Sequence, residues 1–264
     1  STPIKSSAAS DVYKRQISKI PAKKRLADFP HYLEHRAAGL DNLYIFTGTQ
    51  ATPDNIRKFH PNLIVNATGS GPLLPPIKGL MDNIDKEGGN VYSILGMIHH
   101  INDFPQDLEG KKVAVIGGGA VGLDVVEFFA ARKADISIVE MMDQIGRDLD
   151  PVTKNDMKCQ MKAHGVHQLT KTALLEVKEH SFLVKGSEGE YELPFDYGFV
   201  CLGMRAKGQL YPQLLEAFAD DDVEIINIGD SQRARRIIDG TMEGRNILYH
   251  LTQSCLLYTS DAAD

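Results

Sequence analysis

Cysteine is scarce in this 264-residue sequence, which contains three such residues, Cys159, Cys201 and Cys255. They lie far apart and form no C-x-x-C pair. The sequence therefore offers no disulfide framework, no dithiol redox centre and no local ligand set for zinc or an iron–sulfur cluster. Isolated cysteines are usually small buried hydrophobic residues. We name no metal ligands, and any redox chemistry must come from a bound cofactor.

Long apolar runs and long basic stretches are also missing. No segment approaches the roughly 20 apolar residues of a membrane span, and no signal-peptide pattern is visible. The formal net charge is −6, which disfavours nucleic acid and anionic membrane surfaces as partners. We therefore expect a cytoplasmic protein that binds neither nucleic acid nor membrane.

The most informative stretch is a glycine-rich turn between a β-branched run at residues 112–116 and an apolar helix at residues 123–130. Strand, turn and helix in this order are what a dinucleotide-binding fingerprint requires. Gly117 permits the tight bend, Gly119 lets backbone N–H groups approach a pyrophosphate, and Gly122 lets the helix pack close to the strand. The predicted cofactor-binding turn comprises Gly117, Gly118, Gly119, Ala120, Val121 and Gly122.

An acidic residue completes the fingerprint. Residues 135–140 form the next predicted strand, and Glu140 at its tip lies about 20 residues after the turn, where a carboxylate binds the adenosine ribose hydroxyls. A carboxylate would repel a 2′-phosphate, and Met141 and Met142 follow it where an arginine would favour that phosphate. The sequence therefore predicts NADH over NADPH, with Glu140 and Met141 at the site.

Other strands end in the same way. A predicted strand at residues 62–66 runs into Thr68 and Gly69, the strand beginning at Tyr197 ends at Gly203, and a strand from Val223 ends at Gly229-Asp230. Small residues at a strand's carboxyl end let another backbone or a flat ligand come close. This repetition suggests two nucleotide-binding units.

Between these motifs, Asp150 and Pro151 predict the start of a helix that ends near His164, with Gly165 as its cap. Short strands at 166–169, 174–178, 182–184 and 191–193 are interpreted as one meander. A helix is expected at residues 237–243.

In these motifs the sequence resembles the carboxyl-terminal half of a flavoprotein family that contains 2,4-dienoyl-CoA reductase, clostridial 2-enoate reductase and the bile-acid-inducible NADH:flavin oxidoreductases. The resemblance covers most of residues 17–251. It rests on residues 66–69, 117–140, 199–205, 228–230 and 237–244.

The resemblance implies an α/β protein with two Rossmann-like, disulfide-reductase-like domains, in which an NAD(H) domain is inserted into an FAD domain. Gly117, Gly119, Gly122 and Glu140 match the family's NAD(H) motif, and Asp124 matches an acidic position near the nicotinamide pocket. Asp230 matches the aspartate that receives a ribityl hydroxyl of FAD. The other residues implied at the FAD are Thr68, Gly69, Gly203 and Gly229.

The sequence departs from the family in one respect, since residues 1–40 contain no glycine fingerprint for the FAD pyrophosphate. The resemblance also implies an upstream barrel with FMN and a 4Fe–4S cluster, which this sequence does not supply. The two ends also look foreign, since neither shows a helix or strand period that connects to its neighbour, and we expect a fragment cut at both ends. The predicted divisions are a non-native tail at 1–16, an incomplete FAD domain at 17–89 and 209–254, an NAD(H) domain at 90–208, and a second non-native tail at 255–264.

The resemblance implies that the intact enzyme passes a hydride from NADH to FAD, then electrons through the cluster to FMN and an activated double bond. Positioning is the main contribution to hydride transfer, so we name no general acid or base. Two alternatives remain: a pyridine nucleotide–disulfide reductase relative, and an NAD(H)-binding fragment without activity of its own.

Overall fold

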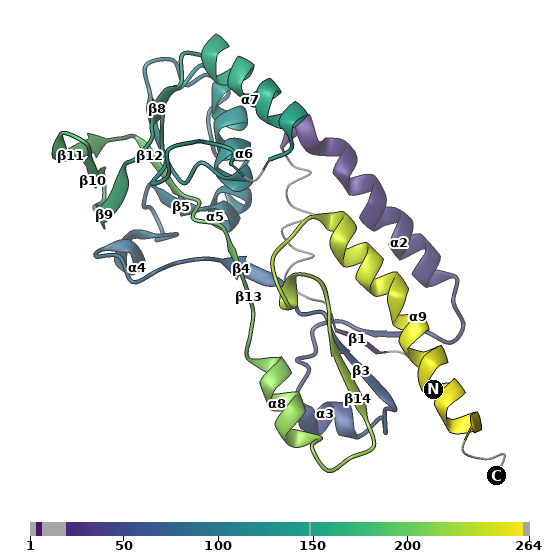
Figure 1. Cartoon of the computed structure of the whole chain (residues 1–264). Coiled ribbons are helices and arrows are strands. Elements are labelled where there is room, and N and C mark those ends of the chain that lie inside the picture. The colour runs from purple at the N-terminus through teal and green to yellow at the C-terminus, as the bar shows by residue number, and fades with distance from the viewer. Residues whose placement is uncertain (1–3, 7–19, 148, 261–264) are drawn as a thin grey trace. The chain divides into compact units, whose positions relative to one another are not determined.

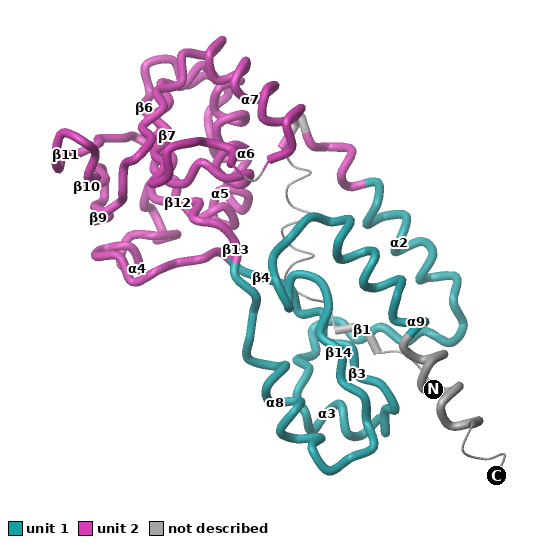
Figure 2. Tube along the Cα trace, viewed as in Figure 1, with its two compact units in different colours: residues 1–13, 28–71, 205–264 teal, residues 14–27, 72–204 magenta. Residues whose placement is uncertain are grey.

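The computed structural model describes residues 4–6, 20–147 and 149–260. They divide into two compact units, and the longer part of unit 2 is inserted between two stretches of unit 1 (Figures 1 and 2). Unit 1 comprises residues 1–13, 28–71 and 205–264, and unit 2 comprises residues 14–27 and 72–204. Most of the predicted N-terminal tail lies outside the described residues.

Unit 2 is built on a five-stranded parallel sheet in the order β5-β12-β6-β7-β8. The apolar runs that the sequence predicts as strands, β12, β6 and β7, are the central members of this sheet. Central strands of a parallel sheet are covered on both faces, so they consist of continuous hydrophobic segments. The elements of the unit are η1 (Pro21–Ala27), α4 (Leu80–Asn83), β5 (Val91–Ser93), α5 (Ile94–His99), β6 (Lys112–Ile116), α6 (Ala120–Ala130), β7 (Asp135–Val139), α7 (Pro151–Ala163), β8 (His167–Leu169), β9 (Ala173–Val177), β10 (Ser181–Gly186), β11 (Gly189–Pro194) and β12 (Tyr197–Val200).

The predicted four-strand meander is wrong in one member. Strands β9, β10 and β11 form an antiparallel sheet, whereas β8 pairs in parallel with β7 at the edge of the large sheet. Helix α7 lies between β7 and β8 in the chain and provides the crossover that a parallel connection needs. Spacing alone could not show this, because short strands look alike on either side of such a crossover.

Helix α7 begins and ends as predicted. The Asp150 carboxylate accepts hydrogen bonds from the backbone N–H groups of Val152 and Thr153, each at 3.1 Å. Hydrogen bonding from Thr153 lowers the pKa of Asp150, as expected for a carboxylate at a helix N-terminus. Gly165 adopts a left-handed φ of 65° just beyond the last turn, which is the conformation of a glycine cap.

Aromatic side chains fill part of the core of unit 2. Phe104, Phe128, Phe129 and Phe199 are almost fully buried, and the ring centroids of Phe129 and Phe199 lie 4.8 Å apart. Helix α6 supplies two of these rings. The helix that follows the glycine turn is therefore fixed to the sheet by large buried surfaces, which keeps the turn in place.

The described strands of unit 1 form two-stranded sheets. Strands β3 and β14 form a parallel pair, and so do β1 and β2. Its elements are β1 (Ile4–Ser6), α2 (Asp28–Ala38), β2 (Tyr44–Phe46), α3 (Pro53–Arg57), β3 (Leu63–Asn66), α8 (Leu210–Ala217), β14 (Glu224–Asn227), η2 (Gly229–Ser231) and α9 (Ile237–Ser260). A further pair, β4 (Ser70–Pro72) with β13 (Met204–Ala206), contains residues of both units. These parallel pairs, with the sheet of unit 2, confirm the predicted α/β class with Rossmann-like elements.

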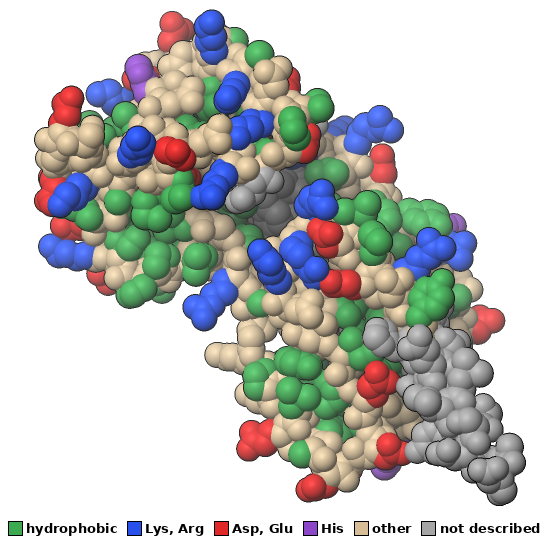
Figure 3. Space-filling view, viewed as in Figure 1, with side chains coloured by type: hydrophobic (Ala, Val, Ile, Leu, Met, Phe, Trp, Pro, Cys, Tyr) green, Lys and Arg blue, Asp and Glu red, His purple; other side chains and the backbone are tan. Residues whose placement is uncertain are grey.

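Among the side chains that the structure describes, the core of unit 1 is small. A buried cluster consists of Ile64, Leu214 and Phe218, with partly buried neighbours around it. Large apolar side chains elsewhere in the unit are exposed, among them Tyr44, Ile45 and Leu215, and Figure 3 shows hydrophobic side chains at the surface over α8. The apolar burial that stabilises unit 1 is therefore limited.

Helix α9 is longer than predicted. The sequence predicts helix over residues 237–243, but α9 continues to Ser260, into the segment expected to be a tail. Within the part of the chain that the structure describes, no helix has both the length and the apolar character needed to cross a membrane.

Candidate functional site

The glycine-rich turn connects the carboxyl end of β6 to the start of α6. Gly117 has a φ of 105°, and a Cβ there would lie 2.2 Å from the carbonyl oxygen of Cys201. At Gly122 a Cβ would lie 1.9 Å from the carbonyl oxygen of Gly117. Real Cβ atoms do not approach backbone so closely, so both positions need glycine for the fold itself.

Gly119 differs from these two glycines. Within the described residues, no heavy atom beyond its chain neighbours and the adjacent helix backbone lies within 4 Å of a Cβ built at Gly119. Gly119 is also the N-cap of α6, and no side chain hydrogen-bonds to that cap. The start of α6, with Ala120 and Val121 as its first residues, therefore faces open space with N–H groups that suit an anion.

Glu140 lies directly after β7 and binds the same turn. Its Oε2 accepts a hydrogen bond of 2.7 Å from the Gly118 N–H, and its Oε1 accepts one of 2.8 Å from the Met142 N–H. Two backbone donors thus fix the carboxylate at the tip of the strand. The intervening Met141 is 68% exposed, so its side chain is available at the surface beside Glu140.

The loop after Glu140 returns to the turn. The Gly146 N–H donates to the Gly118 carbonyl at 2.8 Å, and the buried Ile145 side chain would lie 3.1 Å from a Cβ at Gly118. Gly118 is therefore bound on both its N–H and its C=O. The predicted turn and the predicted acid, which are separated by about 20 residues in the sequence, are therefore in direct contact.

Asp124 lies on α6 and has a partner that the sequence analysis missed. Lys23 in η1 forms an ion pair with the Asp124 carboxylate, and its Nζ lies 3.9 Å from Oε2 of Glu127, one turn further along α6. Burial lowers the pKa of Lys23, while the charge of Glu127 opposes this shift. A partly buried lysine paired with two acids places an ionic cluster on the helix that begins at the glycine turn. The partners are 101 positions apart in the sequence, so no local pattern predicts the pair.

In unit 1, the predicted residues gather at the ends of β3 and β14. Gly69 has a φ of 78°, and Ser70 Oγ donates to Oδ2 of Asp230 at 3.2 Å. The Oγ1 of Thr68 is buried without a hydrogen-bond partner among the described residues. Thr68, Gly69 and Asp230 therefore lie in one neighbourhood, with Ser70 as a further member that the sequence analysis did not single out.

Gly229 adopts a φ of 63°, and its N–H donates to Oε2 of Glu243 at 2.6 Å. The Glu243 carboxylate also pairs with Arg235. The hydrogen bond from Gly229, and then the charge of Arg235, lower the pKa of Glu243. The first turns of α9 thus fix the turn that carries Asp230.

Gly203 follows β12 with a φ of 101°, and its carbonyl accepts a hydrogen bond of 2.9 Å from the N–H of Leu73. A Cβ at Gly203 would meet no heavy atom within 4 Å in the described structure. The left-handed backbone, and not a close neighbour, therefore accounts for this glycine.

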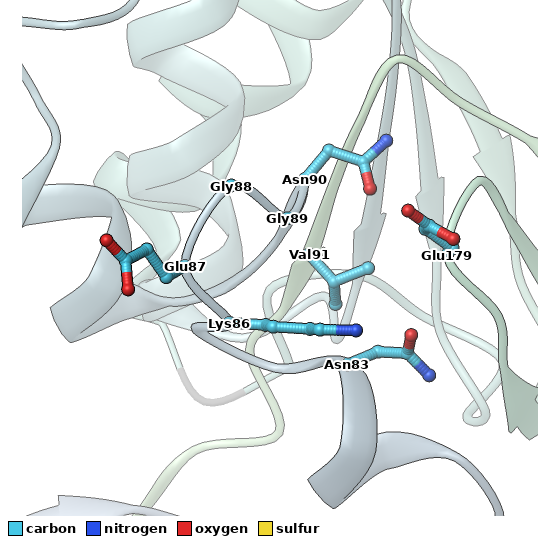
Figure 4. A pocket seen from close by; sticks show the side chains of 8 residues that line it. All are labelled: Asn83, Lys86, Glu87, Gly88, Gly89, Asn90, Val91 and Glu179. Carbon is cyan, nitrogen blue, oxygen red and sulfur yellow. The ribbon is translucent and has the colours of Figure 1, made fainter.

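A polar pocket in unit 2 lies apart from the predicted site. It is lined by Asn83, Lys86, Glu87, Gly88, Gly89, Asn90, Val91 and Glu179 (Figure 4). Val91 begins β5, so the pocket is at the amino ends of the parallel strands, opposite the edge that carries the glycine turn. Ligands of doubly wound sheets bind at the carboxyl ends, and we assign this pocket no part in cofactor binding.

The residues of unit 2 fit a dinucleotide on three counts. Gly119 leaves an open approach, α6 begins without a side-chain cap, and Glu140 is fixed next to both. In unit 1, the unpartnered Thr68 hydroxyl and the Asp230 carboxylate fit a ligand with hydroxyl groups. Such an arrangement can hold cofactors in position, which is the protein's main task in hydride transfer.

Known proteins resemble this chain over most of its length. The sequence is 28% identical over 234 residues to an NADH oxidase from Thermoanaerobacter brockii, covering 88% of this chain and 34% of that protein. It is 27% identical over 262 residues to a metal reductase from Desulforamulus reducens, covering 86% of this chain and 36% of that protein. The chain thus spans about a third of the length of these relatives.

Among solved structures, a complex of 2-naphthoyl-CoA reductase with 2-naphthoyl-CoA matches with a TM-score of 0.71 and 20% identity. The match covers 90% of this chain and 34% of the other chain, and at this identity it shows a shared fold. Residues 8–229 match the sequence family described as pyridine nucleotide-disulphide oxidoreductase, which supports FAD and NADH as the predicted cofactors. With most of its residues matched, the chain belongs to the pyridine nucleotide-disulphide oxidoreductase family.

Proposed function

We propose that this chain is an NADH-dependent flavin oxidoreductase module that passes a hydride from NADH to FAD. The observation that carries the proposal is the carboxylate of Glu140, fixed by the Gly118 N–H beside the open Gly119. This combination suits a dinucleotide with free ribose hydroxyls and a pyrophosphate.

Each predicted residue has a role in this proposal. Glu140 receives the adenosine ribose hydroxyls, and its negative charge disfavours a 2′-phosphate. The N–H groups at the start of α6, from Gly119 to Gly122, bind the pyrophosphate, and the exposed Met141 side chain lies against the adenosine. The ion pair of Lys23 with Asp124 fixes η1 against α6, near the nicotinamide end that the family resemblance implies for Asp124.

The flavin is assigned to unit 1, where Asp230 receives a ribityl hydroxyl and Ser70 orients the Asp230 carboxylate. Thr68, Gly69 and Gly229 let the backbone of unit 1 approach the cofactor, and for Gly203, which follows β12 in unit 2, the family resemblance implies the same role. When both cofactors are bound, nicotinamide supplies the hydride and the isoalloxazine accepts it. The domain division predicted from the sequence is part of the proposal: an NAD(H) domain at residues 90–208 and an FAD domain at residues 17–89 and 209–254. It differs from the compact units at residues 17–27 and 72–89, which lie in unit 2, and at residues 205–208, which lie in unit 1.

We further propose that the module is the electron-input part of a longer enoate reductase-like or dienoyl-CoA reductase-like enzyme. The motif resemblance and the one-third coverage of longer relatives support this. In that enzyme an upstream barrel with FMN and a 4Fe–4S cluster would receive the electrons. A role as a dithiol–disulfide reductase has less support, because the sequence contains no C-x-x-C or C-x4-C pair.

Flavin retention separates the module from a fragment that only binds NAD(H). The purified chain is incubated with FAD, freed of unbound flavin by gel filtration, and examined by visible absorbance. A retained flavin band supports the proposal. No retained flavin, together with measurable NADH binding by fluorescence, would favour the alternative of an NAD(H)-binding fragment.

A further inference from the structure

Two asparagines face each other at the ends of neighbouring strands in unit 1. Asn66 is the last residue of β3, and its register partner on β14 is Asn227. The Asn66 side chain is almost completely buried, at 3% exposure. The carboxyl ends of parallel strands are where doubly wound sheets bind ligands, so this buried amide lies at the edge of the sheet that matters for a cofactor.

The orientation of the Asn66 amide is fixed by its neighbours. Its Nδ2 donates to Oδ1 of Asn227 at 2.8 Å. Asn227 is fixed in turn by Ser231, whose Oγ lies 2.7 Å from the same Oδ1 and whose carbonyl accepts from Asn227 Nδ2 at 3.2 Å. Because the amide nitrogen of Asn66 is directed to Asn227, its amide oxygen points away from Asn227.

That amide oxygen is buried and has no hydrogen-bond partner among the described residues. A buried acceptor without a donor costs free energy, and native structures rarely retain one without a reason. The hydroxyl of Thr68, two residues further along, is in the same condition. Two unpartnered polar atoms thus belong to the same short segment as Ser70, whose hydroxyl binds Asp230, and they indicate a place that a polar ligand completes.

The chemistry of these groups restricts the ligand. A neutral amide oxygen only accepts hydrogen bonds, and the Asp230 carboxylate does the same. A phosphate or carboxylate ligand would bring further acceptors and leave Asn66 unsatisfied. A chain of hydroxyl groups supplies the donors that Asn66 and Asp230 both need, and it can also pair with Thr68.

We propose that Asn66 is a further flavin-binding residue, whose amide oxygen accepts a hydrogen bond from a hydroxyl of the ribityl chain. This rests on the proposed function, which assigns FAD to unit 1. Asn227 and Ser231 act as positioning residues, because they hold the Asn66 amide and need no contact with the flavin.

The test compares the full chain with its Asn66→Leu variant in two measurements. Leucine has a similar size and removes the unsatisfied acceptor, while Asn227 keeps its bond to Ser231. We expect the FAD dissociation constant, measured by quenching of flavin fluorescence, to rise roughly tenfold. The apoprotein Tm should rise by about a few degrees, because a buried unpaired acceptor is gone.

The matched control is Asn90→Leu. Asn90 also has a buried, unpartnered Oδ1, but it lies in unit 2 at the polar pocket (Figure 4), so its replacement should leave FAD affinity unchanged.

Unchanged FAD affinity in Asn66→Leu would overturn this inference and leave the proposed function standing. Weaker FAD binding with a lowered apoprotein Tm would mark a purely structural role and also overturn it. If the unaltered chain binds no FAD at all, the flavin function fails and the inference fails with it.

Discussion

Glu140 is the residue that we expect to distinguish NADH from NADPH. Its two carboxylate oxygens accept hydrogen bonds from Gly118 and Met142, so its position is set before any nucleotide arrives. A preorganised acceptor loses little freedom on binding, which favours affinity. The same negative charge would lie close to a 2′-phosphate and repel it.

Replacing Glu140 with alanine should weaken NADH binding by roughly 10- to 100-fold, since hydrogen bonds to a charged group are worth about 1.5–3 kcal/mol. NADPH binding should change less, because the repulsion disappears together with the hydrogen bonds. Dissociation constants for both nucleotides, from nicotinamide fluorescence, give the comparison.

Glu190→Ala provides the control for this prediction, since Glu190 is an exposed acid on β11 that pairs with Lys185. Equal losses of affinity for NADH and NADPH in Glu140→Ala would contradict the role given to Glu140.

The two cysteines with described surroundings should differ in reactivity. Cys159 is exposed on α7, whereas Cys201 is buried, and burial raises the pKa of the Cys201 thiol to about 12. The thiolate is the reactive form, so at about pH 8 a raised pKa leaves Cys201 protonated and inert.

Alkylation of the native chain followed by mass spectrometry should find Cys159 modified, and Cys201 modified only after unfolding. Rapid labelling of Cys201 in the folded protein would refute its burial beneath the glycine turn.

The turn between strand β6 and helix α6 contains one glycine that the fold requires, Gly122, and one that we expect the cofactor to require, Gly119. Gly122→Ala should destabilise the chain by about 1–3 kcal/mol or more, because the new methyl group overlaps the Gly117 carbonyl. Gly119→Ala should cost less than about 1 kcal/mol, since the N-cap position has open space. Its effect should instead be a loss of NADH affinity.

Thermal unfolding and NADH titration of the two variants check this pair. An unaltered NADH affinity in Gly119→Ala would show that the open space at the turn is not where the pyrophosphate binds.

Elements with a strong local signal could be predicted from the sequence. One βαβ unit contains the apolar run at 112–116, the spaced glycines and the acid Glu140. The geometry of such a unit determines which of its residues come into contact. The start of α7 was equally clear, because Asp150 and Pro151 act on the next few backbone groups. Local chemistry dictates such features, so no knowledge of the rest of the fold is needed.

Long-range pairings could not be predicted in this way. Lys23 with Asp124 and Ser70 with Asp230 meet only after the chain has folded, over separations of 101 and 160 residues. The prediction that β8 belongs to the meander was wrong for the same reason. The crossover through α7, and not the residues of β8 itself, brings β8 next to β7. The unpartnered oxygen of Asn66 likewise requires the structure.

At the scale of the whole molecule, the two units should differ in local stability. Unit 2 buries the central strands and an aromatic cluster, whereas in unit 1 the side chains that the structure describes form a buried cluster of Ile64, Leu214 and Phe218. Local opening is easier where few apolar contacts are lost. Backbone amides of β3 and β14 should therefore exchange with solvent faster than those of β6, β7 and β12.

Hydrogen exchange followed by mass spectrometry of the apoprotein measures this difference directly. Equal protection in the strands of both units would contradict the view that unit 1 has the weaker core.

Hydride transfer from NADH to FAD is tested by the flavin spectrum of the FAD-reconstituted chain under anaerobic conditions, before and after addition of NADH. We expect the oxidised-flavin band to bleach, and NADH to bleach it faster than NADPH does, since Glu140 opposes the 2′-phosphate. Dithionite serves as the control that the bound flavin can be reduced. A flavin band that dithionite bleaches and NADH leaves unchanged would contradict hydride transfer by this chain.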